Sequence, residues 1–402
     1  MLRFLPLIAL AIPLAATAQD KPVVPAGNGT ADRPIVITGT RLPDLRKALQ
    51  ACLDRNCPPD QDVDATLAVA ETQFVDGDYR GARDTIGKSI ARNRRYAKSY
   101  PVAVSDLLRS DSRVAAHLGD RDGFRFRTYD TVTALKAGLP DDDARVVAAR
   151  IEVGDMLVRL GRIEEATKTY LDVERDAAKD GLTMLSGLAR LRIVALFTQL
   201  AARSPSDYLG LARKSAAVLT GSADPAMRPF AQAARILMAK LDARNGDPAA
   251  INRLIADLPM IKGSTVPVLI YAPPIKTATA PPAQFFNFGA GRGARANYDG
   301  EWVDIGFWVA PDGRVTDADV YRSGNGKYQP DWAVPILEAI RGRRYAPLDM
   351  ALSLPGVLRV ERYTWTAWQT KETGSRIDTR EAQPVIEMLD LSVDPPPAAP
   401  KN

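Results

Sequence analysis

The sequence predicts an α+β protein in which a long all-α repeat region precedes a small domain of antiparallel strands and one helix. Residues 64–258 are rich in alanine and leucine, and prolines and glycines fall mainly between their helical stretches. Residues 301–368 instead show apolar alternation, a turn, helical spacing and alternation again. Because 402 residues exceed what one hydrophobic core usually organises, we expect more than one domain.

The C-terminal domain is predicted as strand, tight turn, strand, helix and strand. An apolar residue at every second position from Val303 to Val309 predicts a strand with one core face. The turn comes from Pro311-Asp312-Gly313, because proline presets φ and glycine tolerates the left-handed conformation. Apolar residues at helical spacing over 333–340 and alternation over 358–361 complete the domain.

This order of motifs resembles the C-terminal domain of TonB and TolA-type proteins. The matching motifs are PDGRV at 311–315, RSG at 322–324, LEAI at 337–340 and YAP at 345–347. The resemblance covers residues 301–370, roughly the last quarter of the chain. The alternative is an unrelated small helix-on-sheet domain with a similar turn.

The resemblance implies that this domain captures an extended peptide by adding it as a strand to an exposed sheet edge. We expect the last strand to be that edge, with charged side chains limiting uncontrolled pairing. The predicted partner-binding residues are Leu358, Arg359, Val360, Glu361, Arg362 and Tyr363. The implied partners are proteins or peptides of the cell envelope, TonB-dependent receptors among them, with a role in transmembrane transport.

Residues 1–18 are predicted to be a secretory signal peptide. One early cation, an apolar run and Ala16-Thr17-Ala18 before Gln19 fit a cleavage site. The run is short for a membrane-spanning helix and is interrupted by prolines. Together with the resemblance, this predicts a periplasmic protein. The alternative is an uncleaved inner-membrane anchor, the one case in which we expect membrane contact.

The leader at 19–43 contains a short predicted strand, Ile35, Val36, Ile37 and Thr38. The sequence IVITGTR resembles the TonB-binding region that follows the signal peptide in many TonB-dependent receptors. It could then pair with the edge strand of this chain or of another copy. The alternative is an isolated edge strand.

Two cysteines, Cys52 and Cys57, follow a predicted helix over 42–53. In an oxidising compartment they are expected to form a disulfide that fixes the helix end. Two thiols without a nearby histidine cannot complete a tetrahedral metal site, so no metal is expected.

Residues 44–258 are predicted to stack as four to five helix pairs resembling tetratricopeptide repeats. In the clearest pair, Gly154 and Ala166 allow a close crossing while Leu157 and Tyr170 fill the groove between the helices. An earlier copy has Ala82 and Ile86, and its inter-helix Gly77 matches Gly161. Such stacks present extended faces that bind peptides or proteins. The alternative is an irregular helical domain without a peptide groove.

A basic cluster at Arg92, Arg94, Arg95 and Lys98 suggests either an acidic partner or a solvated helix end. Residues 259–300 are predicted to be a Pro/Gly-rich linker in which VPVLIYAPPI forms a short strand and Phe285, Phe286 and Phe288 dock on the sheet. Residues 371–402 are predicted to be largely disordered.

Few side chains are arranged as catalytic or metal-binding motifs, so we do not expect an enzyme. His117 is the single histidine, lies in a helical stretch and is interpreted as structural. No cofactor, catalytic residue, metal or nucleic acid is expected. We therefore predict a periplasmic protein-binding module. The alternatives are a structural scaffold of the cell envelope with peptide-binding repeats and no transport role, and an unrecognised hydrolase.

Overall fold

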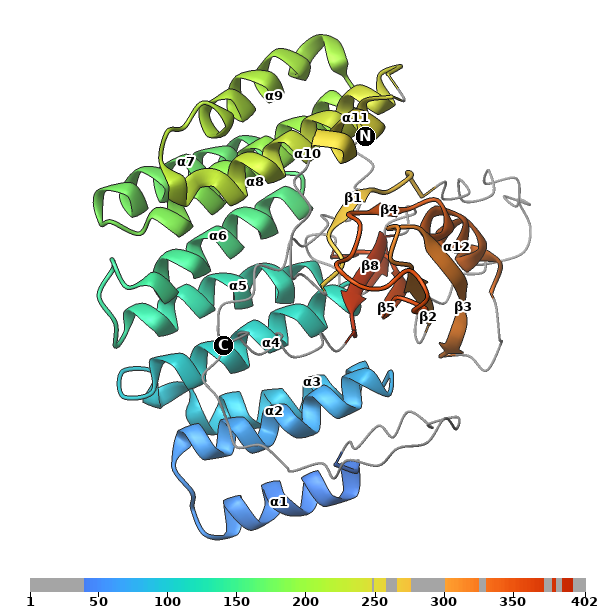
Figure 1. Cartoon of the computed structure of the whole chain (residues 1–402). Helices are drawn as coiled ribbons and strands as arrows, with labels where there is room; N and C mark the ends of the chain where they lie inside the picture. Colours follow the sequence, from blue (N-terminus) through green and yellow to red (C-terminus); the bar gives the residue numbers. More distant parts are fainter. Residues whose placement is uncertain are drawn as a thin grey trace, which may run out of the picture.

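The computed structural model describes residues 40–247, 249–257, 266–275, 301–324, 330–371, 378–380 and 385–392. In this part of the chain, helices α1 to α11 stack in chain order and the strands pack against one side of the stack (Figure 1). The predicted order of a helical-repeat region followed by a small antiparallel sheet with one helix is confirmed. The signal peptide, the strand at Ile35–Thr38 and Phe285–Phe288 lie outside the described residues.

Within the described residues, helix α1 precedes five antiparallel helix pairs, α2–α3, α4–α5, α6–α7, α8–α9 and α10–α11. The helices are Leu42–Asp54 (α1), Pro59–Val75 (α2), Tyr79–Asn93 (α3), Pro101–His117 (α4), Arg121–Lys136 (α5), Ala144–Arg159 (α6), Ile163–Lys179 (α7), Thr183–Ala201 (α8), Pro205–Thr220 (α9), Arg228–Arg244 (α10) and Ala250–Asp257 (α11). Short 3₁₀ turns, Arg94–Tyr96 and Pro225–Met227, follow α3 and precede α10.

The turns within three successive helix pairs adopt the same backbone conformation. Gly77, Gly119 and Gly161 follow one another at intervals of 42 residues and adopt φ of 84°, 71° and 78°. At each, two amide donors return to carbonyls of the preceding helix, as in Asp78 N to Gln73 O at 2.8 Å. The side chain of Asp78 then caps α3 by accepting from the amide of Gly81. Local sequence thus ends one helix and begins the next.

The predicted close crossing of α6 and α7 is confirmed. Tyr170 is fully buried, and a Cβ placed on Gly154 would lie 2.3 Å from its ring. Helix α8 is long and apolar enough to span a membrane by length and composition, but more than half of its most apolar window is buried in the array. It packs between α7 and α9, so it is a core helix of the stack.

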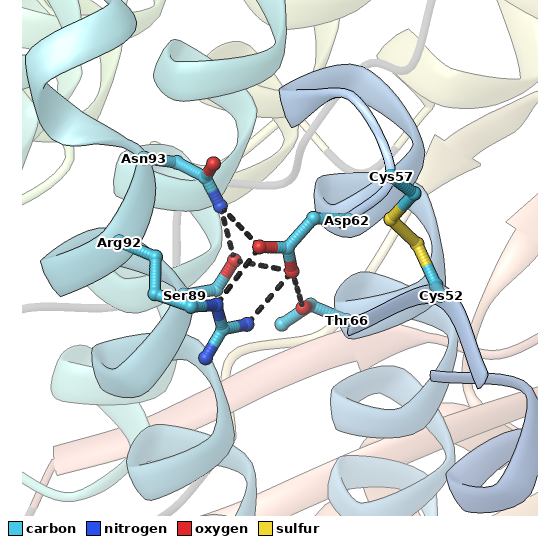
Figure 2. Close-up of a disulfide and its surroundings, with 7 residues drawn as sticks. All are labelled: Cys52, Cys57, Asp62, Thr66, Ser89, Arg92 and Asn93. Atoms are coloured by element: carbon cyan, nitrogen blue, oxygen red, sulfur yellow. Dashed lines mark hydrogen bonds and ion pairs between the residues drawn. A yellow bond between two sulfur atoms is a disulfide. The ribbon is translucent and has the colours of Figure 1, made fainter. Parts of the chain in front are cut away.

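A buried carboxylate fixes α2 to the end of α3, beside the disulfide that joins α1 to the turn before α2 (Figure 2). Arg92 donates to both oxygens of Asp62, at 2.9 and 2.7 Å, and Asn93 donates at 2.7 Å. Burial would raise the pKa of Asp62, but these hydrogen bonds outweigh it and lower the pKa. Arg92 of the predicted basic cluster therefore pairs with Asp62 of the same chain. The disulfide between Cys52 and Cys57 is confirmed.

The C-terminal sheet has the antiparallel order β3-β2-β5-β8. The strands are Leu269–Tyr271 (β1), Trp302–Val309 (β2), Val315–Ser323 (β3), Arg344–Tyr345 (β4), Val357–Thr366 (β5), Gln369–Lys371 (β6), Asp378–Arg380 (β7) and Val385–Asp390 (β8), with α12 at Val334–Arg341. Two further two-stranded sheets pair β1 with β4 and β6 with β7. The short strand expected within the linker is β1.

One face of the sheet forms its own core with α12. The odd-numbered residues of β2 from Val303 to Val309 are fully buried there against Ile336, Leu337 and Ile340. Gly313, with φ of 80°, closes the predicted turn, and its amide donates to the carbonyl of Ala310. Periodicity and turn chemistry therefore predicted β2, β3 and α12 correctly.

The structure contradicts one prediction about the last part of the chain, and a second one for the residues of β7 and β8. The predicted edge strand β5 is internal, because β8 pairs with it from Glu361 to Thr366. Strand β8 itself falls in the tail predicted to be largely disordered. It forms because Ile386 and Met388 pack on the sheet core while Val385, on the opposite face, packs on the helical core.

Candidate partner-binding face

The even-numbered helices define one face of the array, which we call the inner face. Helix α2 contacts α4, α6 contacts α8 and α8 contacts α10, whereas the odd-numbered helices make no comparable contacts with one another in the described part of the chain. Helices that approach closely on one side and separate on the other give a curved stack with the close side inward. The inner face is therefore formed by α2, α4, α6, α8 and α10.

Ion pairs connect neighbouring helices across this face. Arg109 of α4 lies 2.5 Å from Asp106 on its own helix and 3.0 Å from Glu152 of α6. Burial raises the pKa of Asp106, and the Asp64 carboxylate on α2 adds to this, while Arg109 opposes it. Three successive inner helices thus share one electrostatic network.

A second network continues toward α8. Arg192 of α8 lies 3.0 Å from Asp155 of α6, and the Tyr170 hydroxyl donates to the same carboxylate at 2.6 Å. Burial raises the pKa of Asp155, although the Arg192 charge and both contacts oppose it. Burial also raises the pKa of Tyr170 well above its usual value. These groups fix the helix spacing.

Some charged side chains of the inner face are exposed to solvent. Asp64 of α2 and Arg113 of α4 are both exposed, and neither forms an ion pair within the described residues. Each acts on the pKa of Asp106, which places both close to the Arg109 network. An extended face with unpaired charges of both signs can bind a peptide segment through complementary side chains.

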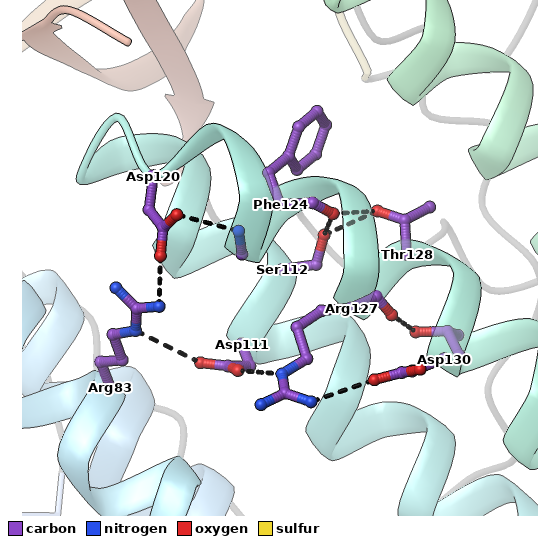
Figure 3. A network of polar contacts seen from close by, with 10 residues as sticks. Arg83, Asp111, Ser112, Asp120, Phe124, Arg127, Thr128 and Asp130 are labelled. Carbon is purple, nitrogen blue, oxygen red and sulfur yellow. Dashed lines mark hydrogen bonds and ion pairs between the residues drawn. The ribbon is translucent and has the colours of Figure 1, made fainter. Parts of the chain in front are cut away.

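The outer side is fixed by a different network, centred on Asp111 of α4 (Figure 3). Its carboxylate is buried and accepts from Arg127 of α5 at 2.8 Å, while Arg83 of α3 lies 4.0 Å away. Arg127 also contacts Asp130 at 3.0 Å. Three helices meet at this carboxylate, so we interpret the network as structural.

The array also has a polar cavity of about 320 Å³ between the ends of α5, α6 and α7. Lys136 and Asp141 in its wall pair at 3.0 Å, and Arg150 and Asp176 pair at 2.7 Å. Because each of these charges already has a partner, the cavity offers no unpaired group to hold a ligand. No group of metal-binding side chains occurs in the described part of the chain.

The C-terminal sheet closes one border of the array through a buried arginine. Arg362 of β5 is fully buried, donates to both oxygens of Asp304, and donates to the carbonyls of Phe74 and Val75 at 2.7 and 2.6 Å. Those carbonyls are at the negative C-terminal end of α2, where a cation is favoured. Trp302 completes the contact, with the guanidinium 3.8 Å from its ring centre. Arg362 therefore provides hydrogen bonds both to its own sheet and to the helical array.

A second junction contact involves the single histidine. His117 Nδ1 lies 2.9 Å from the hydroxyl of Thr364 on β5, and the Tyr79 hydroxyl lies 2.8 Å from the same oxygen. Burial lowers the pKa of His117 to about 4, so the imidazole is neutral at neutral pH. Phe74 packs edge-on against the ring. His117 is thus a buried junction residue, in keeping with its structural interpretation.

The sheet also contacts the next repeats. Arg159 at the end of α6 forms an ion pair with Glu387 of β8. Trp368 packs in the core of the array and stacks on Phe124, with ring centres 5.8 Å apart. The ends of α2, α4 and α6 are therefore covered, while Asp64 and Arg113 stay exposed.

The six residues predicted to bind a partner along β5 are divided by the structure. Leu358 and Arg359 precede the segment that pairs with β8, and Ser392 ends the ladder by binding the backbone of Val360. Arg362 is buried at the junction, and Tyr363 is buried in the sheet core. The six residues therefore do not form one accessible edge.

Glu361 illustrates why the edge prediction failed. Instead of facing solvent, it accepts from Arg343 at 2.8 Å and from the Tyr363 hydroxyl. Burial acts against the charge of Arg343, yet Tyr363 and Glu361 raise its pKa well above the usual value. A charged residue within a strand suggests from sequence alone a solvent-exposed face, because its ion-pair partner is brought to it only by the fold.

Two residues with structural roles, Trp302 and Gly119, were not predicted from the sequence. Trp302 alternates with the core residues of β2 and therefore marks a second packed face, and a Cβ on Gly77 would lie 2.3 Å from its indole nitrogen. Gly119 could have been found from the spacing of Gly77 and Gly161, since it lies midway between them. An internal repeat was thus visible in the glycines.

Comparisons with known proteins give only distant likenesses. No model of a protein family matches the chain, and no curated protein matches it. The solved structure of BtubC (BKLC) from P. vanneervenii is 13% identical, with 52% of this chain and 85% of that chain covered and a TM-score of 0.40. A Podosopora anserina putative kinesin light chain with nearly identical TPR-like repeats is 13% identical, with 50% and 93% covered and a TM-score of 0.37. The resemblance of residues 301–370 to TonB C-terminal domains stays a prediction.

Proposed function

We propose that this chain is a non-enzymatic protein-interaction module that binds a segment of a partner protein on the inner face of its helical array. The observation that carries the proposal is the exposure of Asp64 and Arg113 beside the Arg109 network. Fixed helices lower the entropy that binding costs, and unpaired charges give selectivity. Ordered repeats with an accessible face are the usual architecture for peptide binding.

The sheet has a supporting role in this proposal. Strand addition to β5, the mode implied by the resemblance to TonB C-terminal domains, is disfavoured because β8 already pairs with that strand. Transport coupled to TonB is therefore left out of the proposal. The sheet instead holds the ends of α2, α4 and α6 in place through Arg362, His117 and Arg159.

We place the protein in the periplasm or another oxidising compartment. The expected signal peptide at 1–18 motivates this location, and the disulfide between Cys52 and Cys57 supports it, since disulfides persist mainly outside the reducing cytoplasm. Recovery in the soluble periplasmic fraction of the native cell tests the location. Recovery in the inner membrane would favour the uncleaved anchor, and recovery in the cytosol would refute export.

A second candidate function is a structural scaffold that binds no partner segment. Buried polar contacts that join the sheet to three helix ends favour it, because they make sheet and array one unit. The two functions differ at the inner face. A scaffold does not need that face to be accessible, whereas a peptide-binding module does.

Site-specific photocrosslinking in the native cell separates them. We expect a benzophenone side chain at Gln61 of α2 or Ser110 of α4, each three residues from Asp64 or Arg113 on the same helix face, to crosslink one defined partner band. Matched positions on odd-numbered helices, Tyr129 of α5 and Leu171 of α7, are also exposed and should not give that band. Equal crosslinking from both sets, or none from the inner positions, would refute partner binding on the inner face.

A further inference from the structure

A loop extends from the sheet between Leu348 and Gly356, and its tip at 351–355 is uncharged. Its sequence, Ala351-Leu352-Ser353-Leu354-Pro355, contains no ionisable side chain, and all five residues are exposed. Leu352 is 83% exposed, the highest value among the exposed large hydrophobic residues of the described chain, and Leu354 is 48% exposed. Two large apolar side chains exposed in one loop form a local apolar patch, and apolar patches can mark protein or membrane interaction sites.

The loop is held in position at both ends. The Leu348 amide donates to the Pro311 carbonyl at 2.9 Å, and Leu348 itself is buried in the sheet core. At the other end Gly356 adopts φ of 103°, and a Cβ there would lie 2.0 Å from the carbonyl oxygen of Val309. Between them the Leu354 amide donates to Ala351 at 3.0 Å. The leucines are therefore presented by a defined turn anchored on β2.

Two exposed arginines lie beside the base of this loop. The backbones of Arg314 and Arg344 pair as an isolated β-bridge, which brings the two residues together. Arg314 is 66% exposed and contacts Asp312 at 3.2 Å, a carboxylate that is itself 52% exposed, so the ion pair is weak. Asp312 and the exposed Asp349 are the acidic groups nearest in the chain. The charges roughly balance, so apolar contact must supply most of any binding.

We propose that this loop, which we call the leucine tip, inserts Leu352 and Leu354 into the interface of a lipid bilayer while Arg314 and Arg344 bind lipid phosphates. Interfacial membrane helices combine apolar side chains such as leucine with neighbouring lysine or arginine, and the leucine tip brings together the same residue types. A guanidinium binds a phosphate through two parallel hydrogen bonds. A protein partner is a poorer fit, because a protruding pair of leucines offers far less area than the roughly 800 Å² per side of a stable interface.

Vesicle flotation tests the proposal on residues 19–402, the expected mature chain, so that the apolar residues 1–18 do not contribute. The probes are vesicles of phosphatidylcholine alone and with phosphatidylglycerol. We expect the wild-type chain to float with both, and L352S/L354S to lower the partition coefficient at least tenfold. The matched control L211S/V218S replaces two exposed apolar residues of α9 and should leave flotation unchanged.

Two further measurements keep the proposal open to refutation. Arg314→Gln with Arg344→Gln should lower partition several-fold, and more on phosphatidylglycerol vesicles. Leu352→Cys, labelled with an environment-sensitive dye while the disulfide stays intact, should brighten with vesicles, whereas a label at Leu211→Cys should not. No flotation of the wild type, equal flotation of L352S/L354S, or a lipid-free dimer that L352S/L354S dissociates would overturn membrane insertion. The dimer would identify the tip as a protein contact.

Discussion

Arg362 and Asp304 form a buried ion pair between β5 and β2, in which the Nε–Oδ1 distance is 2.6 Å and both side chains are at most 1% exposed. The same guanidinium donates to two carbonyls at the end of α2. Asp304 also accepts from Arg322 at 2.8 Å, and Arg322 reaches the Val75 carbonyl. The Arg362–Asp304 pair therefore connects β5 with β2 and, through the same hydrogen-bonded network, connects the sheet with the end of α2.

We expect Arg362→Ala to destabilise the protein by about 3 kcal/mol, the lower end for breaking a buried pair, because Asp304 keeps Arg322 as a partner. The loss has two sources. The buried Asp304 carboxylate has one cation fewer, and the Phe74 and Val75 carbonyls each lose one of two donors. Urea unfolding followed by circular dichroism measures it.

The matched control is Arg314→Ala, which removes an arginine from a pair whose two side chains are both more than half exposed. Its stability should stay within about 0.5 kcal/mol of the wild type. If both variants lost the same stability, the buried pair would have no special role at the junction.

The second prediction concerns acid. The folded-state pKa of His117 is about 4, against a usual value of 6.5, because burial disfavours the charged ring. The unfolded chain therefore binds the proton more tightly, so the stability that neutral His117 contributes is present above pH 6.5 and is lost as pH falls toward 4. From these two values the loss between pH 7.5 and pH 5 is about 2 kcal/mol.

His117→Gln isolates this effect, since glutamine can bind Thr364 and does not titrate. The free energy of unfolding should fall by about 2 kcal/mol less between pH 7.5 and pH 5 in the variant than in the wild type. Glu387, Arg159 and Arg362 face the ring in both proteins, so their own titration cancels in the comparison. Parallel pH profiles for the two proteins would contradict the assigned protonation state.

The sequence predicted those parts of the fold whose signals are local. The alternation from Val303 to Val309, the turn at Gly313 and the small-large pairing of Gly154 with Tyr170 each depend on residues close in the chain. Periodicity and backbone conformation decide such elements before any tertiary contact forms. That is why β2, α12 and the helix pairs were predicted correctly.

The candidate site was harder, because its signals come from distant residues. Glu361 and Arg362 resemble the charges of a solvent-facing edge, yet their partners Arg343, Asp304 and Val75 are far away in sequence. A buried charge is costly without those partners, so sequence alone favours an exposed position. Strand β8 was harder to predict for a different reason. Its six residues, VIEMLD, do not alternate strictly between apolar and polar, and they stand beside a proline-rich tail.

Two glycine substitutions provide the third prediction. Gly154→Ala should destabilise the protein by about 1–3 kcal/mol, because the new methyl group would lie 2.3 Å from the buried Tyr170 ring. Gly87→Ala in α3 should instead stabilise it by about 0.5–1 kcal/mol, because the position is open and alanine is the better helix former. Thermal unfolding of both variants gives the comparison. Effects of the same sign would show that helix propensity, and not the close crossing, decides the outcome.

The last prediction concerns the disulfide. Cys52 and Cys57 are five residues apart and join the end of α1 to the turn before α2. A link that closes so short a loop restricts the unfolded chain modestly, so Cys52→Ser with Cys57→Ser should cost about 2 kcal/mol. Helix α1 contacts the array mainly through α2, so we expect the loss to appear first as faster amide exchange in α1. Exchange in α6 and α7, distant members of the stack, should be unchanged below the global unfolding limit. Uniformly faster exchange through all helices would instead mean that the disulfide stabilises the array as a whole.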